Sequence, residues 1–228
     1  MAVLVGDPSG EEEVLTKRLL GPVAEGLRQG GASRVQVNVV DPDLGPPHGL
    51  VPGPDSVRLG AAISWWVAAA GDTGVHHRLL PDSDRWTWHS FVVCEAIQLQ
   101  GPPAPPDGGR CVGFTQIVPL TVPHELSWAE WRHRWQGGHT TVAIETQSSF
   151  RYVQNVVVRP LSDRAPAFAA IVEESFPLRA ATDPAVFYDA EGDEVRYNSN
   201  LTRMLNSCAR FMSGDVPIVW TAEYRPPD

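Results

Sequence analysis

A histidine that follows a tryptophan-rich segment carries the most specific chemistry in this sequence. His139 comes four residues after Trp135, behind the glycine pair at positions 137 and 138. A neutral imidazole can accept or donate a proton near pH 7, which makes His139 a candidate general acid or base. The alternative is a structural histidine, whose ring N–H ties a helix end to a backbone carbonyl or a neighbouring strand.

Three polar side chains follow in a segment that predicts a β-strand. Residues 149–159, SFRYVQNVVVR, alternate and are rich in β-branched residues. Successive side chains of a strand point to opposite faces, so Tyr152 and Gln154 share one face and Asn155 lies on the other. Buried polar groups need partners or a ligand. These residues are candidates to polarise a substrate carbonyl or bind a phenol, and the alternative is an interface between two halves of the molecule.

A second histidine lies among tryptophans in the segment RWTWHSF. Trp86 and Trp88 stand at alternating positions beside His89. Aromatic rings around an imidazole suit a planar substrate, which would stack on the ring faces. His89 is therefore a further candidate catalytic residue, and Trp86, Trp88, Trp135 and Trp65 are candidate substrate-binding residues. A surface loop packed down by its tryptophans is the alternative.

Several glutamates fall inside predicted strands. A buried carboxylate with a raised pKa would make a general base, but a carboxylate inside a strand is costly unless it is paired. We expect Glu95 and Glu223 on the solvent face of the sheet. Of the neighbours Glu173 and Glu174, one must face inward if the strand is regular.

The sequence contains no metal or cofactor signature. Its three cysteines, at positions 94, 111 and 208, form no CxxC pair and have no histidine at ligand spacing. The adjacent His76 and His77 should point apart, and we expect them to be exposed. Glycine-rich nucleotide and phosphate loops, HExxH and GxSxG are also missing. The sequence therefore predicts neither a bound metal nor a cofactor.

The elements that must position these residues are clearest in the C-terminal half. Ser127 and Glu130 form a capping box that predicts the start of a helix, and the glycine pair predicts a break or bend in it. Strands are expected at 111–119, 149–159, 168–176 and 216–224, and helices at 127–147, 183–189 and 198–212. This order is β-α-β-β-α-β, with a short extra helix.

The N-terminal half follows the same plan less completely. Strands are expected at 2–6, 35–40, 59–68 and 90–100, a helix kinked at Gly21-Pro22 at 11–28, and a turn around 74–84 in place of the second helix. The stretch 41–54 is rich in proline and glycine and predicts a loop, and 101–109 predicts a linker. We therefore expect an α+β protein with a degenerate ferredoxin-like unit at 1–100 and a complete one at 110–228, packed sheet to sheet.

The segment from Ser127 to Val158 resembles the EthD family of the dimeric α+β barrel superfamily. Members have a helix with an acidic-aromatic start, a tryptophan and a histidine near its end, and then a strand with a tyrosine and an asparagine. In SWAEWRHRWQGGHTTVAIETQSSFRYVQNVV the corresponding residues are Trp135, His139, Tyr152 and Asn155, with Gln154 in the strand motif. The resemblance implies an intrachain dimeric α+β barrel and an aromatic-lined pocket for a hydrophobic or aromatic small molecule.

Composition limits the partners and the function. The net charge of −9 and the lack of a basic run argue against nucleic acid, and no apolar run is long enough to cross a membrane. With no signal peptide pattern, we expect a cytoplasmic protein, either a monomeric pseudo-dimer or a homodimer. The resemblance implies a cofactor-independent cyclase, dehydratase or isomerase that acts by proton transfer on an aromatic or polyketide-like molecule. A non-catalytic binding or accessory protein, or a haem enzyme with His139 or His89 as axial ligand, are the alternatives.

Overall fold

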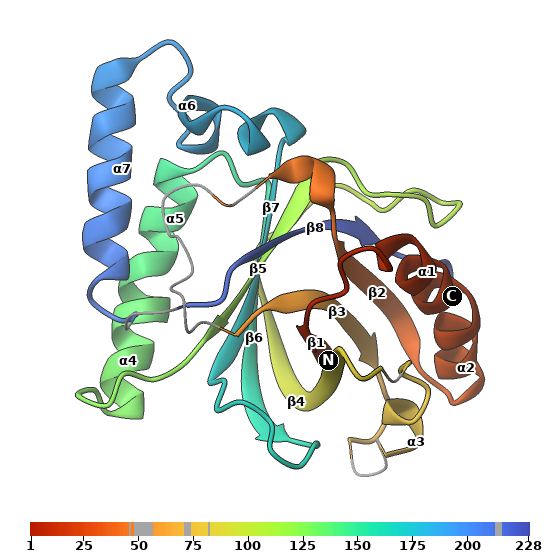
Figure 1. Ribbon diagram of the computed structural model, residues 1–228. Helices are drawn as coiled ribbons and strands as arrows, with labels where there is room; N and C mark the ends of the chain where they lie inside the picture. The colour runs from red at the N-terminus through yellow and green to blue at the C-terminus, as the bar shows by residue number, and fades with distance from the viewer. Residues whose placement is uncertain (46, 48–56, 71–73, 82, 213–215) are drawn as a thin grey trace.

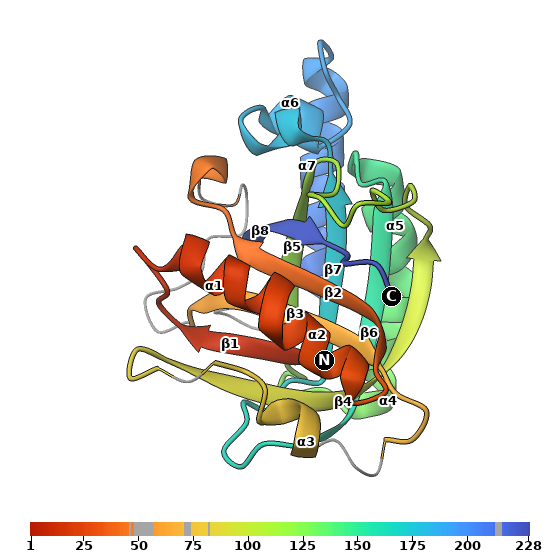
Figure 2. The same cartoon turned by 90° about the vertical axis from the view of Figure 1, so that its right-hand side faces the viewer.

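A closed β-barrel forms the centre of the molecule. The computed structural model describes residues 1–228 except 46, 48–56, 71–73, 82 and 213–215. In this described part, eight antiparallel strands run around the barrel in the order β1-β3-β2-β8-β5-β7-β6-β4 (Figures 1 and 2). They are β1 (Ala2–Gly6), β2 (Ser33–Val40), β3 (Leu59–Trp66), β4 (Trp86–Leu99), β5 (Phe114–Leu120), β6 (Arg151–Pro160), β7 (Ala170–Phe176) and β8 (Val219–Tyr224).

The barrel contradicts the predicted α+β arrangement of two ferredoxin-like units packed sheet to sheet as an intrachain dimeric α+β barrel. β2 pairs with β8, and β4 pairs with β6. These two ladders join strands from both halves of the chain edge to edge, so that all of them belong to the same closed sheet. Such pairing satisfies backbone N–H and C=O groups that separate sheets would leave open at their edges. The prediction is wrong because alternation shows which residues form strands but not which strands pair.

One group of helices follows β1 and packs on its side of the barrel. The predicted helix at 11–28 is confirmed and consists of α1 (Glu12–Arg18), the π-turn η1 (Leu19–Val23) and α2 (Ala24–Gln29). Pro22 lies inside η1, where the wider turn accommodates a residue that has no backbone N–H to donate. The short α3 (Gly74–His77) stands where a turn was expected, and the 3₁₀ turn η2 (Pro42–Leu44) follows β2.

A second group of helices covers the opposite side of the barrel (Figure 1). It contains α4 (Trp128–Arg134), the π-turn η3 (Trp135–His139), α5 (Thr140–Thr146), the 3₁₀ turn η4 (Leu178–Ala181), α6 (Pro184–Phe187) and α7 (Glu194–Cys208). The capping box is confirmed, because Ser127 Oγ accepts from the Glu130 N–H at 3.2 Å and Glu130 Oε2 accepts from the Ser127 N–H at 3.0 Å. The glycine pair widens the helix into a π-turn, so the predicted bend takes that form.

Apolar side chains fill one part of the barrel interior. Val3, Phe91, Ile117 and Ile171 come from four different strands and belong to one buried cluster. Because alternate residues of these strands point the other way, Trp88, Val118 and Val172 face the surrounding helices instead. The barrel wall therefore has an apolar inner face and an apolar outer face, and the outer face packs against the helices.

Charged and amide side chains fill the remaining part of the interior. Arg151 Nη1 lies 2.9 Å from Glu173 Oε2 and 3.5 Å from Glu223 Oε2. Gln36 Nε2 donates to Glu173 at 2.6 Å, and Asn155 Nδ2 donates to the same carboxylate at 2.8 Å. Burial raises the pKa of Glu173, but the Arg151 charge and these hydrogen bonds outweigh it and lower the pKa below its ordinary value. The carboxylates are therefore paired structural charges.

This interior cluster corrects the prediction for Glu223. The side chain was expected on the solvent face of the sheet, but only 3% of the residue is exposed. Arg225 Nε and Thr115 Oγ1 both donate to its carboxylate, at 2.6 and 2.7 Å. The prediction for Glu223 is wrong because closure of the sheet creates a barrel interior, and the side chain of Glu223 points into it. Glu95 is opposite Asn155 in the β4–β6 ladder, so it also lies on the inner face of the sheet and not on the predicted solvent face. It is partly exposed there and lies 3.5 Å from Arg34 Nη2.

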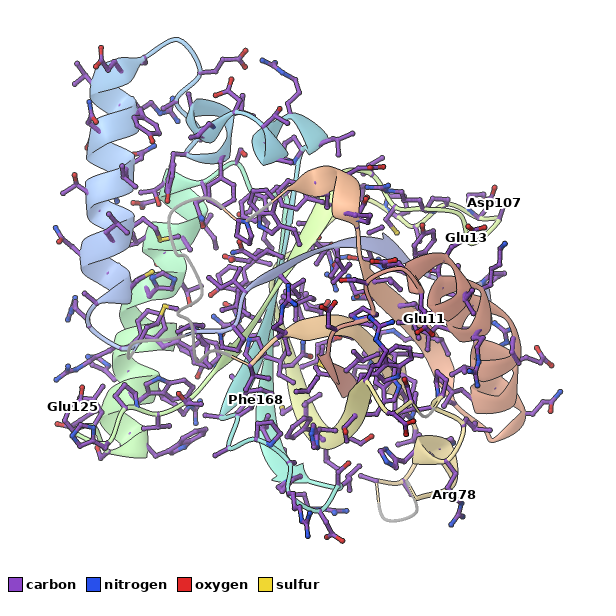
Figure 3. The ribbon with its side chains drawn as sticks, viewed as in Figure 1. Glu11, Glu13, Arg78, Asp107, Glu125 and Phe168 are labelled. Carbon is purple, nitrogen blue, oxygen red and sulfur yellow. The ribbon has the colours of Figure 1, made fainter. Side chains whose placement is uncertain are left out.

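Other charged side chains lie at the outside of the molecule. Glu13, Arg78, Asp107 and Glu125 are all exposed, and Figure 3 shows them at the periphery of the ribbon. Among the residues that the structure describes, no helix combines the length and the apolar character needed to cross a membrane.

Candidate functional site

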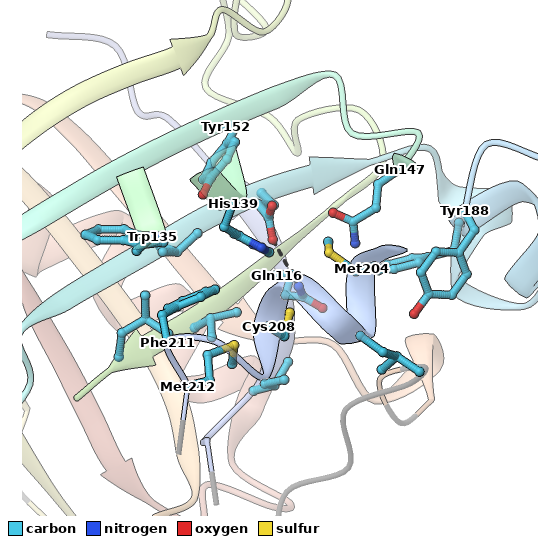
Figure 4. A pocket seen from close by; sticks show the side chains of 17 residues that line it. Gln116, Trp135, His139, Gln147, Tyr152, Tyr188, Met204, Cys208, Phe211 and Met212 are labelled. Atoms are coloured by element: carbon cyan, nitrogen blue, oxygen red, sulfur yellow. Dashed lines mark hydrogen bonds between the residues drawn. The ribbon is translucent and has the colours of Figure 1, made fainter. Parts of the chain in front are cut away.

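A cavity lies between the outer face of β5, β6 and β7 and the helices on that side. Its polar or ionisable lining comes from strands and helices alike: Gln116, His139, Gln147, Tyr152, Glu174 and Cys208. Aromatic and apolar side chains complete it, among them Trp135, Phe187, Tyr188, Met204 and Phe211 (Figure 4). The volume of the cavity is about 50 Å³. An apolar cavity with a few converging polar groups is the usual form of a small-molecule site.

Glu174 is the most unusual group in this cavity. It lies in β7 with 6% of its surface exposed, and Gln116 Nε2 donates to its Oε2 at 3.2 Å. Trp220 Nε1 in turn donates to Gln116 Oε1 at 3.0 Å, which fixes the orientation of that amide. Burial raises the pKa of Glu174 to about 7, and the hydrogen bond from Gln116 only partly offsets the rise. The carboxyl therefore changes charge near neutral pH, as a general base should.

His139 contributes a neutral imidazole to the same cavity. The π-turn η3 ends at this residue, and its Nδ1 lies 3.0 Å from Ser207 Oγ on α7. The ring also packs against Phe211, with centroids 4.7 Å apart. Burial lowers the pKa of His139 to about 4. At pH 7 the ring is uncharged, so it can donate one hydrogen bond and accept another but is a weak base.

Tyr152 stands across the sheet ladder from Glu174 on the same face. Gln154 Nε2 donates to the Tyr152 hydroxyl at 3.1 Å and to Thr140 Oγ1 at 2.8 Å. Burial raises the pKa of Tyr152, the nearby Glu174 charge raises it further, and hydrogen bonds to Gln154, Trp135 and Thr140 only partly offset the rise. The hydroxyl therefore keeps its proton at neutral pH. The amide of Gln154 therefore positions this hydroxyl. The amide is itself fixed, because Gln136 Nε2 donates to Gln154 Oε1 at 3.1 Å.

Cys208 adds a thiol that stays protonated. Helix α7 turns Met204 and Cys208, four residues apart, toward the cavity. Burial and the charge of Glu174 together raise the pKa of the Cys208 thiol to about 12. A group with so high a pKa is not a ready nucleophile at neutral pH, which leaves Glu174 as the ionisable group of interest.

Two predicted site residues from the strand motif are separated by the barrel wall. The predicted alternation holds, since Tyr152 lines the cavity and Asn155 points into the barrel, where it donates to Glu173. Asn155 also lines a different pocket, beside Phe91 and Glu95. It is therefore not part of the cavity that contains His139 and Tyr152.

The predicted aromatic clamp around His89 is not found in the structure. Trp86 and Trp88 belong to the buried cluster under α1 and α2, and each indole N–H donates to the Pro81 carbonyl, at 3.2 and 3.1 Å. Strand alternation places His89 on the other face of β4, so the indoles do not flank its ring. Its Nδ1 is buried without a hydrogen-bond partner among the described residues.

The other two predicted substrate-binding tryptophans lie on different sides of the barrel. Trp135 lines the cavity, and its ring packs against Trp131 with centroids 4.9 Å apart. Trp65 lies on the far side of the barrel near His76, with ring centroids 6.1 Å apart. His76 corrects the expectation of exposure, because it is buried and its Nε2 lies 3.1 Å from the Gly30 carbonyl oxygen.

Sequence reasoning did not assign a role to Gln116, Gln147 or Cys208 and treated Glu174 only as one of a pair. The signal for Glu174 was present in the segment AIVEESF, where two carboxylates interrupt an apolar strand. Both prove to be buried, one on each side of the barrel wall. In the described part of the chain, no group of three or more histidine, cysteine, aspartate or glutamate side chains could hold a metal ion.

Comparison with known proteins supports the fold. No family model matches the chain, and no curated protein sequence does so either. Among solved structures, that of an anthrone oxidase-like protein is similar, with a TM-score of 0.51 and 13% sequence identity over 97% of this chain and 89% of the other. At this identity the likeness concerns the fold alone. The resemblance to the EthD family stays a prediction.

These findings also correct part of the predicted function. The closed barrel conflicts with the dimeric α+β barrel and ferredoxin-like descriptions, and nothing in the comparisons supports a cyclase or a polyketide substrate. Both were implied by the sequence resemblance, whose motif residues lie in the segment from Ser127 to Val158. A short motif of this kind cannot specify a reaction outcome.

Proposed function

We propose that this protein is an enzyme that removes a proton from a small aromatic molecule, with Glu174 as the general base. The observation that carries the proposal is a buried carboxyl in an aromatic-lined cavity whose pKa is raised to about 7. A carboxylate that has lost most of its water is a stronger base than one in solution, yet it is still ionised near pH 7. The buried carboxylates with a structural role differ from Glu174, because Glu173 and Glu223 each have an arginine partner.

The neighbouring groups suit a proton transfer that creates an oxyanion. The Tyr152 hydroxyl accepts a hydrogen bond from Gln154, so its own proton remains available to a substrate oxygen. His139 is neutral, and if Ser207 donates to Nδ1 the ring proton lies on Nε2 and is a second donor. Donors that are already held in position stabilise developing negative charge. The substrate class that fits is an aromatic ketone or phenol with an acidic C–H or O–H.

The structural similarity suggests a more specific reaction. An anthrone is a tricyclic aromatic ketone whose CH₂ group lies between two rings, and the similar structure is an anthrone oxidase-like protein. Removal of one proton by Glu174 would give an electron-rich anion able to react with O₂. With O₂ as the oxidant, the CH₂ carbon becomes a carbonyl and one molecule of water is released. This oxidation is our second candidate, and the proton removal is its first step.

Replacement of the base tests the proposal. We expect Glu174→Gln to slow exchange of the anthrone CH₂ protons with D₂O, followed by NMR, by about 100-fold or more, because that is the usual contribution of a general base. Glu145→Gln is the matched control, since Glu145 is an exposed glutamate on α5 that pairs with Arg203. Oxygen consumption under the same conditions tests the second candidate.

Full exchange by Glu174→Gln, or no exchange above the uncatalysed rate in the wild-type protein, would contradict the proposal. If anthrone binds without exchange, the non-catalytic binding protein predicted as an alternative is favoured. A Soret band in the absorption spectrum of the purified protein would favour the haem alternative.

A further inference from the structure

The end of the cavity formed by Gln147 contains an unsatisfied polar group. Gln147 ends helix α5, and 6% of its surface is exposed. Its Oε1 is buried and has no hydrogen-bond partner among the described residues. The backbone N–H of Gln147 already donates to the Ala143 carbonyl at 3.2 Å, so the side chain is not needed to close the helix. Buried acceptors in folded proteins are almost always paired, and an exception calls for a ligand or a water.

The surroundings of this amide favour the ring of an aromatic ligand. Tyr188 and Met204 line the same cavity, and Figure 4 shows Gln147 toward the end where they lie, with Trp135 and Tyr152 toward the other end. The Tyr188 ring meets Phe187 edge-on at 5.1 Å between centroids. A flat ligand can therefore contact aromatic and thioether surfaces while its edge faces the amide.

We propose that Gln147 is a specificity residue that recognises a hydroxyl group on the aromatic ring of the substrate. This inference rests on the proposed function, because it concerns the same cavity and the same class of molecule. A hydroxyl both donates and accepts, so it satisfies the amide whichever way Oε1 and Nε2 are oriented. A hydrogen bond to Gln147 holds the substrate ring in one orientation and therefore determines which substrate atom faces Glu174. The substrate class is thereby narrowed to hydroxylated aromatic molecules.

Two probes of equal shape separate this hydrogen bond from apolar contact. 2-Naphthol and 2-methylnaphthalene differ by a hydroxyl in place of a methyl group, and titration calorimetry gives the dissociation constant of each. We expect the wild-type protein to bind 2-naphthol more tightly by about tenfold, the size of one hydrogen bond to a buried group. Gln147→Met keeps the length of the side chain and removes the amide, so the ratio should fall to about one.

Two further variants control the measurement. Gln147→Asn keeps the amide but withdraws it by one methylene, so it should also lose the preference for the hydroxyl. Gln29→Met replaces an exposed glutamine of α2, far from the cavity, and should keep the wild-type ratio. Thermal unfolding of each variant confirms that the comparison is between folded proteins.

An unchanged ratio in Gln147→Met, a wild-type ratio near one, or no binding of either probe would each overturn the inference. Its failure is distinct from failure of the proposed function. If Gln147→Met keeps the preference while Glu174→Gln abolishes proton exchange, only the role of Gln147 is wrong. If Gln147→Met loses the preference while Glu174→Gln exchanges protons at the full rate, only the role of the base is wrong.

Discussion

Replacing Glu174 by glutamine should change how the stability of the protein depends on pH. The pKa of this carboxyl is raised from 4.5 to about 7 in the folded protein. Below pH 4.5 the carboxyl is protonated in the folded and unfolded states alike. Between pH 4.5 and about 7 it is protonated only in the folded state, so the free energy of unfolding falls as the pH rises.

The size of this effect follows from the pKa interval. Each pH unit in that window contributes ~1.4 kcal/mol, so the interval from 4.5 to about 7 corresponds to ~3 kcal/mol. Glutamine does not titrate, so the difference in free energy of unfolding between Glu174→Gln and wild type should grow in favour of the variant by that amount and level off above pH 7. Other groups cancel in the difference as long as their environments are unchanged.

Urea unfolding at half-unit steps from pH 4 to 8.5 measures this difference. The linear extrapolation gives the free energy of unfolding at each pH for both proteins, and Glu145→Gln is the control in which the difference should stay flat. A flat difference for Glu174→Gln would refute the reasoning, because it would mean that the carboxyl has an ordinary pKa in the folded protein. The proposed role as a base near pH 7 would then have no support.

Two further predictions concern the cavity and the barrel. His139→Gln should remove the opposite pH dependence: burial lowers the pKa of His139 from 6.5 to about 4, so the wild-type protein should lose ~3 kcal/mol relative to the variant as the pH falls from 6.5 to 4, measured by urea unfolding. Arg151→Met should lower the free energy of unfolding at pH 7 by about 3–5 kcal/mol, because it leaves the buried carboxylates of Glu173 and Glu223 without their shared partner. An Arg151→Met protein as stable as wild type in the same measurement would contradict the structural role of that cluster.

Local features of the fold could be predicted from the sequence. The capping box at Ser127, the bend at the glycine pair and the opposite directions of Tyr152 and Asn155 all depend on residues within a few positions of one another. Closure of the barrel could not be predicted in this way. It depends on pairing such as Asn38 with Glu223, between strands that are far apart in the chain, and hydrophobic alternation contains no information on partners.

The candidate site was predicted in part for the same reason. His139, Tyr152 and Trp135 meet in the cavity because they lie on one helix–strand segment. Glu174 reaches that cavity from another strand, and only the register of β6 with β7 places it opposite Tyr152. The predicted aromatic clamp around His89 is wrong for a different reason. Trp86 and Trp88 point to one face of the strand and His89 points to the other. Strand alternation therefore already argued against an aromatic clamp around His89.

Burial keeps both His139 and Glu174 uncharged over the same range of pH. Burial keeps His139 neutral down to about pH 4 and keeps Glu174 protonated up to about pH 7, so no ion pair forms between them at any pH in this interval. A charged imidazole in the same cavity would stabilise the carboxylate and lower the pKa of Glu174. The base would then ionise earlier but would be weaker toward a carbon or phenolic acid. A neutral His139 therefore preserves the basicity of Glu174, and above pH 7 the carboxylate is the charge available for proton transfer.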